Sequence, residues 1–141
     1  METVEYAVEN DLWADEFIDL LLRSTLAERR PVKERARIET MLKHANLIVT
    51  ARDGEGRLIG VSRCVTDFSF CCYCSDLAVD QAWQGKGVGQ RLLDESAAAA
   101  GPYAHFFLIS APKAVGFYEK IGMRRLGTAF ERADWKRFAD Q

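Results

Sequence analysis

Apolar residues in the first third of the chain recur every three or four positions in two stretches, the spacing of one face of an α-helix. In the first stretch, which follows a short alternating segment at 3–8, these residues are Trp13, Phe17, Leu20 and Leu21. In the second, which begins after Pro31, they are Ile38, Met41, Leu42 and Ala45. We expect a short strand and then two helices, the first capped by the side-chain oxygen of Asn10 or Asp11.

The middle of the chain changes to runs of β-branched and aromatic residues, which favour strands. Runs at 47–51 and 57–66 flank a glycine-containing turn at 53–56, a pattern typical of an antiparallel hairpin. A third run, 70–79, extends the same sheet. The continuously apolar run 104–109 is typical of a short buried strand.

Glycine and proline delimit two further helices. One is expected at 87–100 and ends at Gly101; the other begins near Pro112 and ends at Gly122. From Met123 onward we expect one or two final strands.

The predicted order of elements is β-α-α-β-β-β-α-β-α-β(-β). This order indicates the α/β (α+β) class, with a mixed, mostly antiparallel sheet flanked by helices on both faces. No linker or internal repeat divides residues 1–141, so we expect a single domain. The order of elements alone names no activity.

The composition is close to that of an average globular protein, with 48% hydrophobic and 28% charged residues. A formal net charge of −2 argues against a nucleic-acid partner held by a broad basic face. No apolar run approaches the roughly 18 to 20 residues of a membrane-spanning helix, and the first residues lack the features of a signal peptide. We therefore expect a cytoplasmic protein with neither a membrane nor a nucleic-acid partner.

The cysteines are clustered, which is unlike a disulfide framework. They are Cys64, Cys71, Cys72 and Cys74. Cys71 and Cys74 form a C-x-x-C string, but residues three apart on a strand point to opposite faces and cannot jointly grip zinc. Neither His44 nor His105 stands at a metal-site spacing from them. We expect buried, reduced thiols and no metal.

Three glycines within five residues, Gly85, Gly87 and Gly89, follow a predicted strand and lead directly into a predicted helix. Glycine permits positive φ and removes the Cβ atoms that keep a ligand from the backbone. Successive N–H groups and the partial positive charge of a helix start suit a phosphate or pyrophosphate. We therefore expect an anion site in this loop, with Gln84 and Lys86 beside the glycines.

Two common phosphate motifs do not fit the loop. A P-loop closes with Lys-Ser or Lys-Thr, and neither pair occurs here. The dinucleotide fingerprint G-x-G-x-x-G fails because Gln90 stands three residues after Gly87, where glycine or alanine is needed for close packing.

Two segments resemble the hallmarks of one family, the GNAT superfamily of acyl-CoA-dependent N-acetyltransferases. Residues 84–89 read QGKGVG and are similar to its Q/R-x-x-G-x-G/A signature. Residues 117–123 read FYEKIGM and are similar to its second hallmark, F-Y-E-K-x-G-F. Residues 76–80 also resemble the family's fourth strand. Because the predicted order of elements matches as well, the resemblance covers nearly the whole chain.

The resemblance implies that acetyl-CoA, as cosubstrate, lies where the fourth and fifth strands splay apart. The backbone of the fourth strand would pair with the pantetheine arm through Leu77, Ala78 and Val79. The loop would bind the diphosphate through Gln84, Gly85, Lys86, Gly87, Val88, Gly89 and Gln90. Physically, an amide-bearing arm suits an open strand edge, and phosphates suit a helix start.

The implied reaction is direct attack of a primary amine, of a small molecule or of a peptide or protein, on the thioester in a ternary complex. Tyr118 matches the family's general acid, which protonates the leaving thiolate. A backbone N–H near Val79 would stabilise the developing negative charge. Ser110 either assists Tyr118, contacts CoA or caps a helix, and we favour the cap.

The general base is not identified. Many relatives place a carboxylate or histidine in the fourth strand, where this chain has Tyr73 and Ser75. Asp76 is adjacent, but strand alternation directs it to the other face. A water relay, Asp67 or Glu28 remain as alternatives.

An acceptor pocket is implied between the first two helices, their connection and the last strands. Its candidate residues are Trp13, Phe17, Leu26, Arg29, Arg30, Phe68, Phe70 and Tyr73. Such a wall suits an amine with an aromatic or acidic portion, although Trp13 and Phe17 fit the core better.

Two rival interpretations stay open. One is a noncatalytic acyl-CoA-binding regulatory module on the same fold, motivated by the missing base. The other is ping-pong transfer through a cysteine, which is disfavoured because no histidine lies near the cluster in the sequence. A homodimer also stays open.

Overall fold

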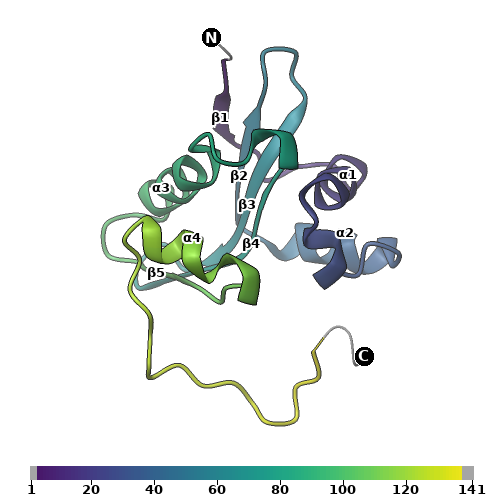
Figure 1. The fold of residues 1–141 in the computed structure, drawn as a ribbon. Helices are drawn as coiled ribbons and strands as arrows, with labels where there is room; N and C mark the ends of the chain where they lie inside the picture. Colours follow the sequence, from purple (N-terminus) through teal and green to yellow (C-terminus); the bar gives the residue numbers. More distant parts are fainter. Residues whose placement is uncertain (1–2, 138–141) are drawn as a thin grey trace. The chain divides into compact units, whose positions relative to one another are not determined.

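The computed structural model describes residues 3–137 and divides the chain into two compact units, Met1–Leu108 and Ile109–Gln141 (Figure 1). The first unit contains the sheet and helices α1 to α3. The second contains a short helix and the C-terminal segment.

One sheet of five strands has the order β1-β2-β3-β4-β5. The strands are β1 (Glu5–Val8), β2 (Leu47–Arg52), β3 (Leu58–Thr66), β4 (Cys71–Val79) and β5 (His105–Leu108). Neighbours pair antiparallel, except that β4 and β5 pair in parallel. The predicted hairpin is present as β2 and β3. Its turn is closed by Gly56 at φ +82°, whose N–H donates to the Asp53 carbonyl at 3.0 Å.

Helices cover both faces of this sheet. The helices α1 (Ala14–Ser24) and α2 (Arg35–His44) lie on one face, and α3 (Val88–Ala100) lies on the other (Figure 1). Single 3-10 turns, η1 (Leu26–Arg29) and η2 (Gln81–Trp83), precede α2 and α3. The predicted α/β (α+β) class with a mostly antiparallel sheet is confirmed. None of the helices within residues 3–137 combines the length and apolar character needed to cross a bilayer.

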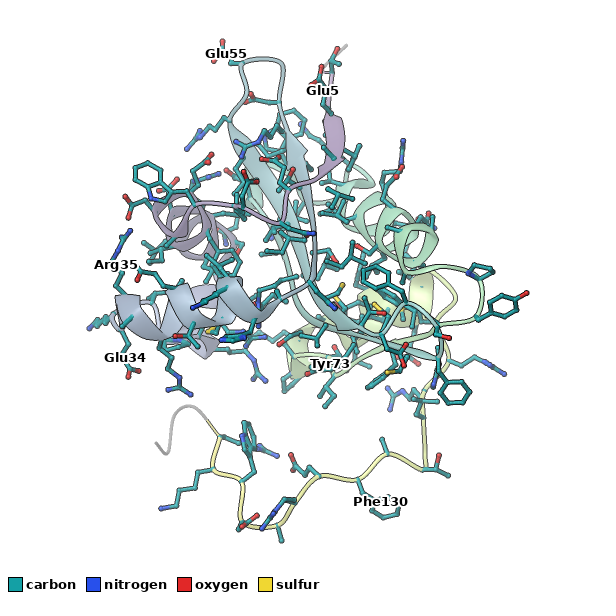
Figure 2. All side chains as sticks on the ribbon, turned by 180° about the vertical axis from the view of Figure 1, so that it is seen from behind. Glu5, Glu34, Arg35, Glu55, Tyr73 and Phe130 are labelled. Carbon is teal, nitrogen blue, oxygen red and sulfur yellow. The ribbon has the colours of Figure 1, made fainter. Side chains whose placement is uncertain are left out.

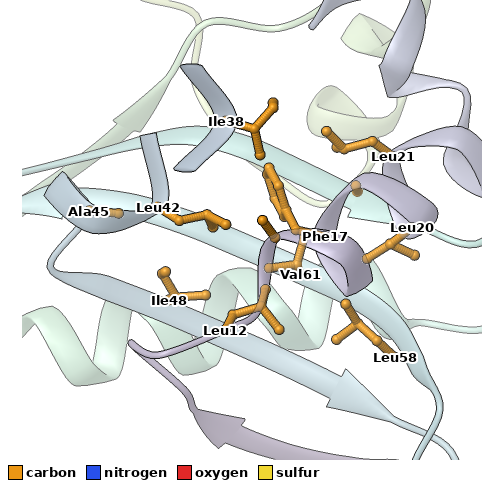
Figure 3. Packing of buried hydrophobic residues seen from close by; sticks show 12 residues of the cluster. Leu12, Phe17, Leu20, Leu21, Ile38, Leu42, Ala45, Ile48, Leu58 and Val61 are labelled. Atoms are coloured by element: carbon orange, nitrogen blue, oxygen red, sulfur yellow. The ribbon is translucent and has the colours of Figure 1, made fainter. Parts of the chain in front are cut away.

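The main core lies between α1, α2 and the sheet (Figure 3). Its fully buried side chains include Phe17, Leu20, Leu21, Ile38, Ile48 and Val61. Burial of an apolar side chain of this size contributes about 1.5–3 kcal/mol. The helical stripes predicted from the sequence therefore hold this face of the sheet together.

Two predictions about the first helix are wrong. Trp13 is 62% exposed because it precedes α1 as the N-cap residue, in an extended conformation. Asn10 does not cap the helix: its Oδ1 accepts from the Ile48 N–H at 2.8 Å, and its Nδ2 donates to the Asn46 carbonyl at 3.3 Å. Asn10 therefore joins the segment after β1 to the start of β2.

A β-bulge in β4 changes which face its side chains occupy. The register pairs Arg63 with Asp76 but the next β3 residue with Cys74, so Ser75 is an extra residue in β4. Cys74 Sγ lies 3.5 Å from Ser62 Oγ, on the side covered by α3, whereas Asp76 meets Arg63 on the opposite side. The Ser75 hydroxyl also accepts from Arg63, at 3.0 Å. The expectation that Ser75 and Asp76 point to opposite faces is therefore wrong.

The four cysteines are free thiols, and Cys64, Cys72 and Cys74 are buried while Cys71 is exposed. The hydrogen bond with Cys74 and burial raise the pKa of Cys64, and burial raises the pKa of Cys72 to about 12. Such thiols stay protonated and unreactive at neutral pH. The prediction of buried thiols is thus confirmed for three of the four. Within residues 3–137, no group of three or more His, Cys, Asp or Glu side chains is arranged to hold a metal ion.

The second unit starts with η3 (Pro112–Ala114) and continues into α4 (Val115–Lys120). The predicted helix is therefore present, with a 3-10 turn at its start. The predicted final strands are absent from residues 123–137. A strand needs a neighbouring backbone, whereas the bonds here are local, such as the Trp135 N–H to the Arg132 carbonyl at 3.1 Å. Phe130 is 95% exposed (Figure 2).

Candidate functional site

The glycine loop, residues 84–89, follows η2 directly and includes the first two residues of α3. Gly85 and Gly87 have φ of +78° and +84°, in the left-handed region that favours glycine. Gly87 is the N-cap residue of α3. The loop is exposed, apart from Val88, whose side chain is buried, and Gly89, which is half-buried. The three-glycine pattern is thus explained in part by the tight entry into the helix.

The backbone N–H groups at the start of α3 are available to a ligand. The first helical bond runs from the Arg91 N–H to the Gly87 carbonyl, at 3.1 Å. The N–H groups of Val88, Gly89 and Gln90 precede it, and within residues 3–137 they donate to no protein acceptor. The helix start therefore offers an anion several adjacent donors.

The edge of β4 next to this loop lacks a partner strand. β5 pairs with residues 71–74 only, so the last five residues of β4 are bonded on the β3 side alone among residues 3–137. The Asp80 N–H donates to the Ile59 carbonyl of β3 at 2.8 Å. Because peptide groups alternate along an antiparallel strand, Ala78 also faces β3, whereas Leu77 and Val79 direct theirs to the unpartnered edge.

Gln84 connects the loop to this edge. Its side-chain Nε2 donates to the Val79 carbonyl at 3.0 Å, which leaves the Val79 N–H as the group directed outward. Lys86 lies over the ring of Trp83, with Nζ 5.1 Å from the ring centroid, and so extends the positive charge beside the loop. Of the three strand residues predicted to contact acetyl-CoA through the backbone, the register favours Leu77 and Val79 and turns Ala78 away.

Tyr118 belongs to α4 in the second unit. Its ring meets Phe117 edge-on, with centroids 5.1 Å apart, and its carbonyl accepts from the Met123 N–H at 3.1 Å. Ser110 does not cap a helix, because its hydroxyl donates to the Ala111 carbonyl at 2.7 Å and Ala111 is the N-cap residue of η3. The predicted cap is therefore wrong for Ser110.

Asp67 is committed to building a turn. Its Oδ1 accepts from the N–H groups of Phe70, Ser69 and Cys71, at 2.7, 2.9 and 3.0 Å. These three bonds lower the pKa of Asp67 to about 2, the Phe70 N–H making the largest contribution. An acid with so low a pKa is a poor proton acceptor at neutral pH, so Asp67 is a weak candidate for the base.

Asp76 is likewise engaged. Its carboxylate is fully buried and is paired with both Arg30 and Arg63. Arg30 also donates to the Ser75 carbonyl at 2.8 Å, and Arg63 donates to the Met41 carbonyl at 3.3 Å. Arg30, predicted to line the acceptor pocket, is instead bound to the β4 bulge.

Sequence reasoning missed this cluster of three charges. One signal was available: Arg63 and Asp76 interrupt strands that are otherwise mostly apolar. A charged side chain on a buried strand requires a partner of opposite charge.

The aromatic residues predicted to line the acceptor pocket differ in exposure. Phe17 is fully buried in the core, as favoured from the sequence, while Phe68 and Phe70 are 50% and 77% exposed. Tyr73, labelled in Figure 2, is half-buried and packs on Phe107, with ring centroids 5.3 Å apart. A hollow of about 300 Å³ lies apart from the loop, lined by Ala7, Val8, Val49, Glu95, Ala98 and Ala99. It lacks converging polar groups.

Comparison with known proteins identifies the family. The family model described as "Acetyltransferase (GNAT) domain" matches residues 23–138. The chain belongs to the GNAT acetyltransferase family. The match spans the glycine loop and the 117–123 segment, so the resemblance noted from both motifs is confirmed.

Individual relatives of this GNAT chain are distant. It is 25% identical over 99 residues to ycf52, an uncharacterized N-acetyltransferase of Porphyra purpurea, covering 67% of this chain and 55% of that protein. The chain thus spans about half the length of this curated relative.

Solved structures share the fold. A GNAT-family acetyltransferase from Streptococcus pneumoniae has a TM-score of 0.71 at 21% identity, with 95% of this chain and 100% of that chain covered. A Trypanosoma brucei acetyltransferase has a TM-score of 0.61 at 26% identity, with 92% and 99% covered. The GNAT fold of this chain is therefore supported along most of its length.

Proposed function

We propose that this GNAT chain transfers an acetyl group from acetyl-CoA to a primary amine, of a small molecule or of a peptide or protein, by direct transfer in a ternary complex. The observation that carries the proposal is the group of N–H donors at Val88, Gly89 and Gln90, next to the unpartnered edge of β4. Family membership supplies the activity class.

The residues present suit acetyl-CoA. The α3 start and the glycine loop offer N–H donors to the diphosphate, and Lys86 adds positive charge there. The outward peptide groups of Leu77 and Val79 offer bonds to the amides of the pantetheine arm, as a strand edge does for an extended peptide. The thioester supplies the activated acetyl group.

Proton movements complete the proposed reaction. The amine nitrogen forms the new C–N bond while the C–S bond breaks, and a backbone N–H near Val79 stabilises negative charge on the thioester oxygen. Tyr118 donates its phenolic proton to the departing thiolate. The amine proton leaves through an ordered water or to the exposed Glu28, because Asp67 and Asp76 are engaged elsewhere. We keep the cytoplasm as the proposed location.

One observation favours a second candidate, a noncatalytic acyl-CoA-binding module. Tyr73 and Ser75 occupy the β4 positions where a base is expected, and the nearby carboxylate of Asp76 is enclosed by two guanidinium groups. A chain without a base would bind acetyl-CoA but not turn it over.

Two measurements decide between these functions. Calorimetric titration with acetyl-CoA tests binding, and thiol detection of released CoA across a panel of primary amines tests transfer. Binding with amine-dependent CoA release supports the acetyltransferase. Binding without release for any amine favours the regulatory module. No heat of binding at millimolar acetyl-CoA would overturn both.

A further inference from the structure

We propose that Asp80 is a positioning residue for the diphosphate of acetyl-CoA: paired with Arg23, it fixes the segment that presents the amides of the glycine loop. This inference rests on the proposed function. It assigns a part in coenzyme binding to a part-buried ion pair outside both hallmark motifs.

Asp80 is fixed by both its side chain and its backbone. It follows β4 directly and is 8% exposed. Its Oδ1 accepts from the Ala82 N–H at 2.8 Å, capping η2, and its Oδ2 accepts from Arg23 of α1. Its N–H donates to the Ile59 carbonyl and its carbonyl accepts from the Trp83 N–H, each at 2.8 Å. The backbone therefore leaves β4 in one defined direction.

Arg23 is itself held, so the pair is a fixed point between α1 and the sheet. Besides Asp80, its guanidinium donates to the Leu58 carbonyl at 2.7 Å and to Asp19 at 2.9 Å. Burial alone would raise the pKa of Asp80, but the Ala82 N–H and Arg23 outweigh it, and the pKa is lowered. The carboxylate is therefore charged at neutral pH, as its two donors require.

The direction of the backbone at Asp80 determines the position of the glycine loop, because the short turn η2 between them is fixed by hydrogen bonds. Only η2 separates Asp80 from Gln84. The Gln84 N–H donates to the Gln81 carbonyl at 3.4 Å, and the Gln84 side chain is bonded to the Val79 carbonyl. Lys86 then packs over Trp83 of η2. A change in the direction of η2 would consequently turn the donors that the diphosphate needs.

The test compares Asp80→Asn with wild type, using acetyl-CoA in calorimetry and in steady-state turnover. The amide retains an oxygen for one donor but loses the charge, so we expect the Kd and KM for acetyl-CoA to rise about tenfold. The kcat at saturating acetyl-CoA should stay within twofold of wild type. S-acetylpantetheine, a donor without the diphosphate, should show unchanged kcat/KM because it does not use the loop.

Three further variants control the experiment. Asp19→Asn removes the charge of the Arg23 partner that is 61% exposed, an ion pair that contributes little, and leaves Asp80 in place, so it should bind acetyl-CoA like wild type. Arg23→Lys keeps a positive charge near Asp80 and should raise the Kd less than Arg23→Met does. This second pair keeps the proposal testable if Asp80→Asn does not fold.

The outcomes separate this proposal from the proposed function. Absence of acetyl-CoA binding by the wild-type chain would overturn the proposed function. Wild-type binding together with an unchanged Kd in folded Asp80→Asn would overturn the positioning role. Equal loss of turnover with acetyl-CoA and S-acetylpantetheine would also overturn it, because the pair would then support the fold as a whole.

Discussion

Arg63 and Asp76 face each other across β3 and β4, and the carboxylate of Asp76 is completely buried between Arg63 and Arg30. The cluster sits at the extra residue of β4, and the two guanidinium groups also bond to the hydroxyl and carbonyl of Ser75. No buried side-chain nitrogen or oxygen in the described part of the chain lacks a hydrogen-bond partner. The bulge is therefore held by charge as well as by the β-ladder, at the point where the partner strand β5 ends.

Removal of the Asp76 charge should destabilise the protein strongly. Asp76→Asn leaves Arg63, whose side chain is only 8% exposed, without a full counter-charge, and breaking such a buried pair costs about 3 kcal/mol. Urea unfolding followed by circular dichroism measures the loss.

The matched control is Glu39→Gln, because Glu39 and Arg35 form an ion pair in which both side chains are about half exposed. A change below about 0.5 kcal/mol is expected there. If Asp76→Asn also changed stability by less than about 0.5 kcal/mol, the cluster would not hold the bulge.

Replacement of Gly87 should weaken acetyl-CoA binding for a backbone reason. Gly87 has φ +84°, and a left-handed conformation costs an L-residue roughly 1–2 kcal/mol. A Cβ there meets nothing within 4 Å, so Gly87→Ala acts through conformation and not through a clash. We expect a several-fold rise in the Kd for acetyl-CoA by calorimetry.

Gly54→Ala provides the comparison for Gly87→Ala. Gly54 lies in the hairpin turn, away from the left-handed region, and its Cβ would also meet nothing within 4 Å. Unchanged affinity in Gly54→Ala and reduced affinity in Gly87→Ala is the expected pair of results. Equal affinities would show that the Gly87 conformation does not matter for binding.

Much of the fold could be predicted from local patterns, because helical stripes such as Phe17 and Leu21 and the alternating strands are local properties of the chain. The β-bulge in β4 could not be predicted from the sequence. One extra residue reverses the faces of β4 without changing its hydrophobic pattern. Burial of Arg30 against Asp76 likewise depends on a contact across 46 positions.

In the candidate site, too, local features could be predicted from the sequence and long-range contacts could not. The glycine loop has a local signature, since residues 84–89 contain both the turn and the helix start. The Arg23–Asp80 pair joins residues 57 positions apart, and neither local sequence predicts that the two side chains meet. One or two final strands were predicted from Met123 onward, but the structure shows only local bonds within residues 123–137.

Only one cysteine should react quickly in the folded protein. Cys71 is exposed, whereas the other three are buried, with the pKa of Cys72 raised to about 12 by burial. A thiol-specific disulfide reagent should modify one thiol per chain rapidly, and Cys71→Ser should abolish that phase.

The same cysteine tests the ping-pong alternative. Transfer in a ternary complex predicts full activity for Cys71→Ser and no acetylated enzyme after incubation with acetyl-CoA alone. An acetyl adduct on a cysteine, detected by mass spectrometry in the absence of amine, would instead support a covalent route.

Asp67 should stabilise the folded protein at neutral pH and lose this contribution in acid. Its pKa in the folded protein, about 2, lies below the unfolded value of 3.8, so its contribution is complete above about pH 4 and disappears as the pH falls toward 2. Asp67→Asn should flatten the decrease in stability between pH 4 and 2, as measured by thermal unfolding. Asp53→Asn is the comparison, because the Asp53 side chain also accepts backbone N–H bonds, in the hairpin turn. An equally steep decrease in both variants and wild type would refute the role of Asp67.

Tyr118→Phe should separate chemistry from binding. The phenylalanine retains the ring that contacts Phe117 but has no proton to give, and loss of a general acid typically costs 10²-fold or more in rate. We expect kcat to fall about 100-fold while the Kd for acetyl-CoA stays within twofold.

Tyr103→Phe is the control, because Tyr103 is 82% exposed and lies outside both hallmark motifs. If the thioester carried a better leaving thiolate, such as an aromatic one, the difference between wild type and Tyr118→Phe should shrink, since such a thiolate needs less protonation. A penalty that is independent of the leaving group would show that Tyr118 supports the fold or the binding of substrate, and does not donate the proton.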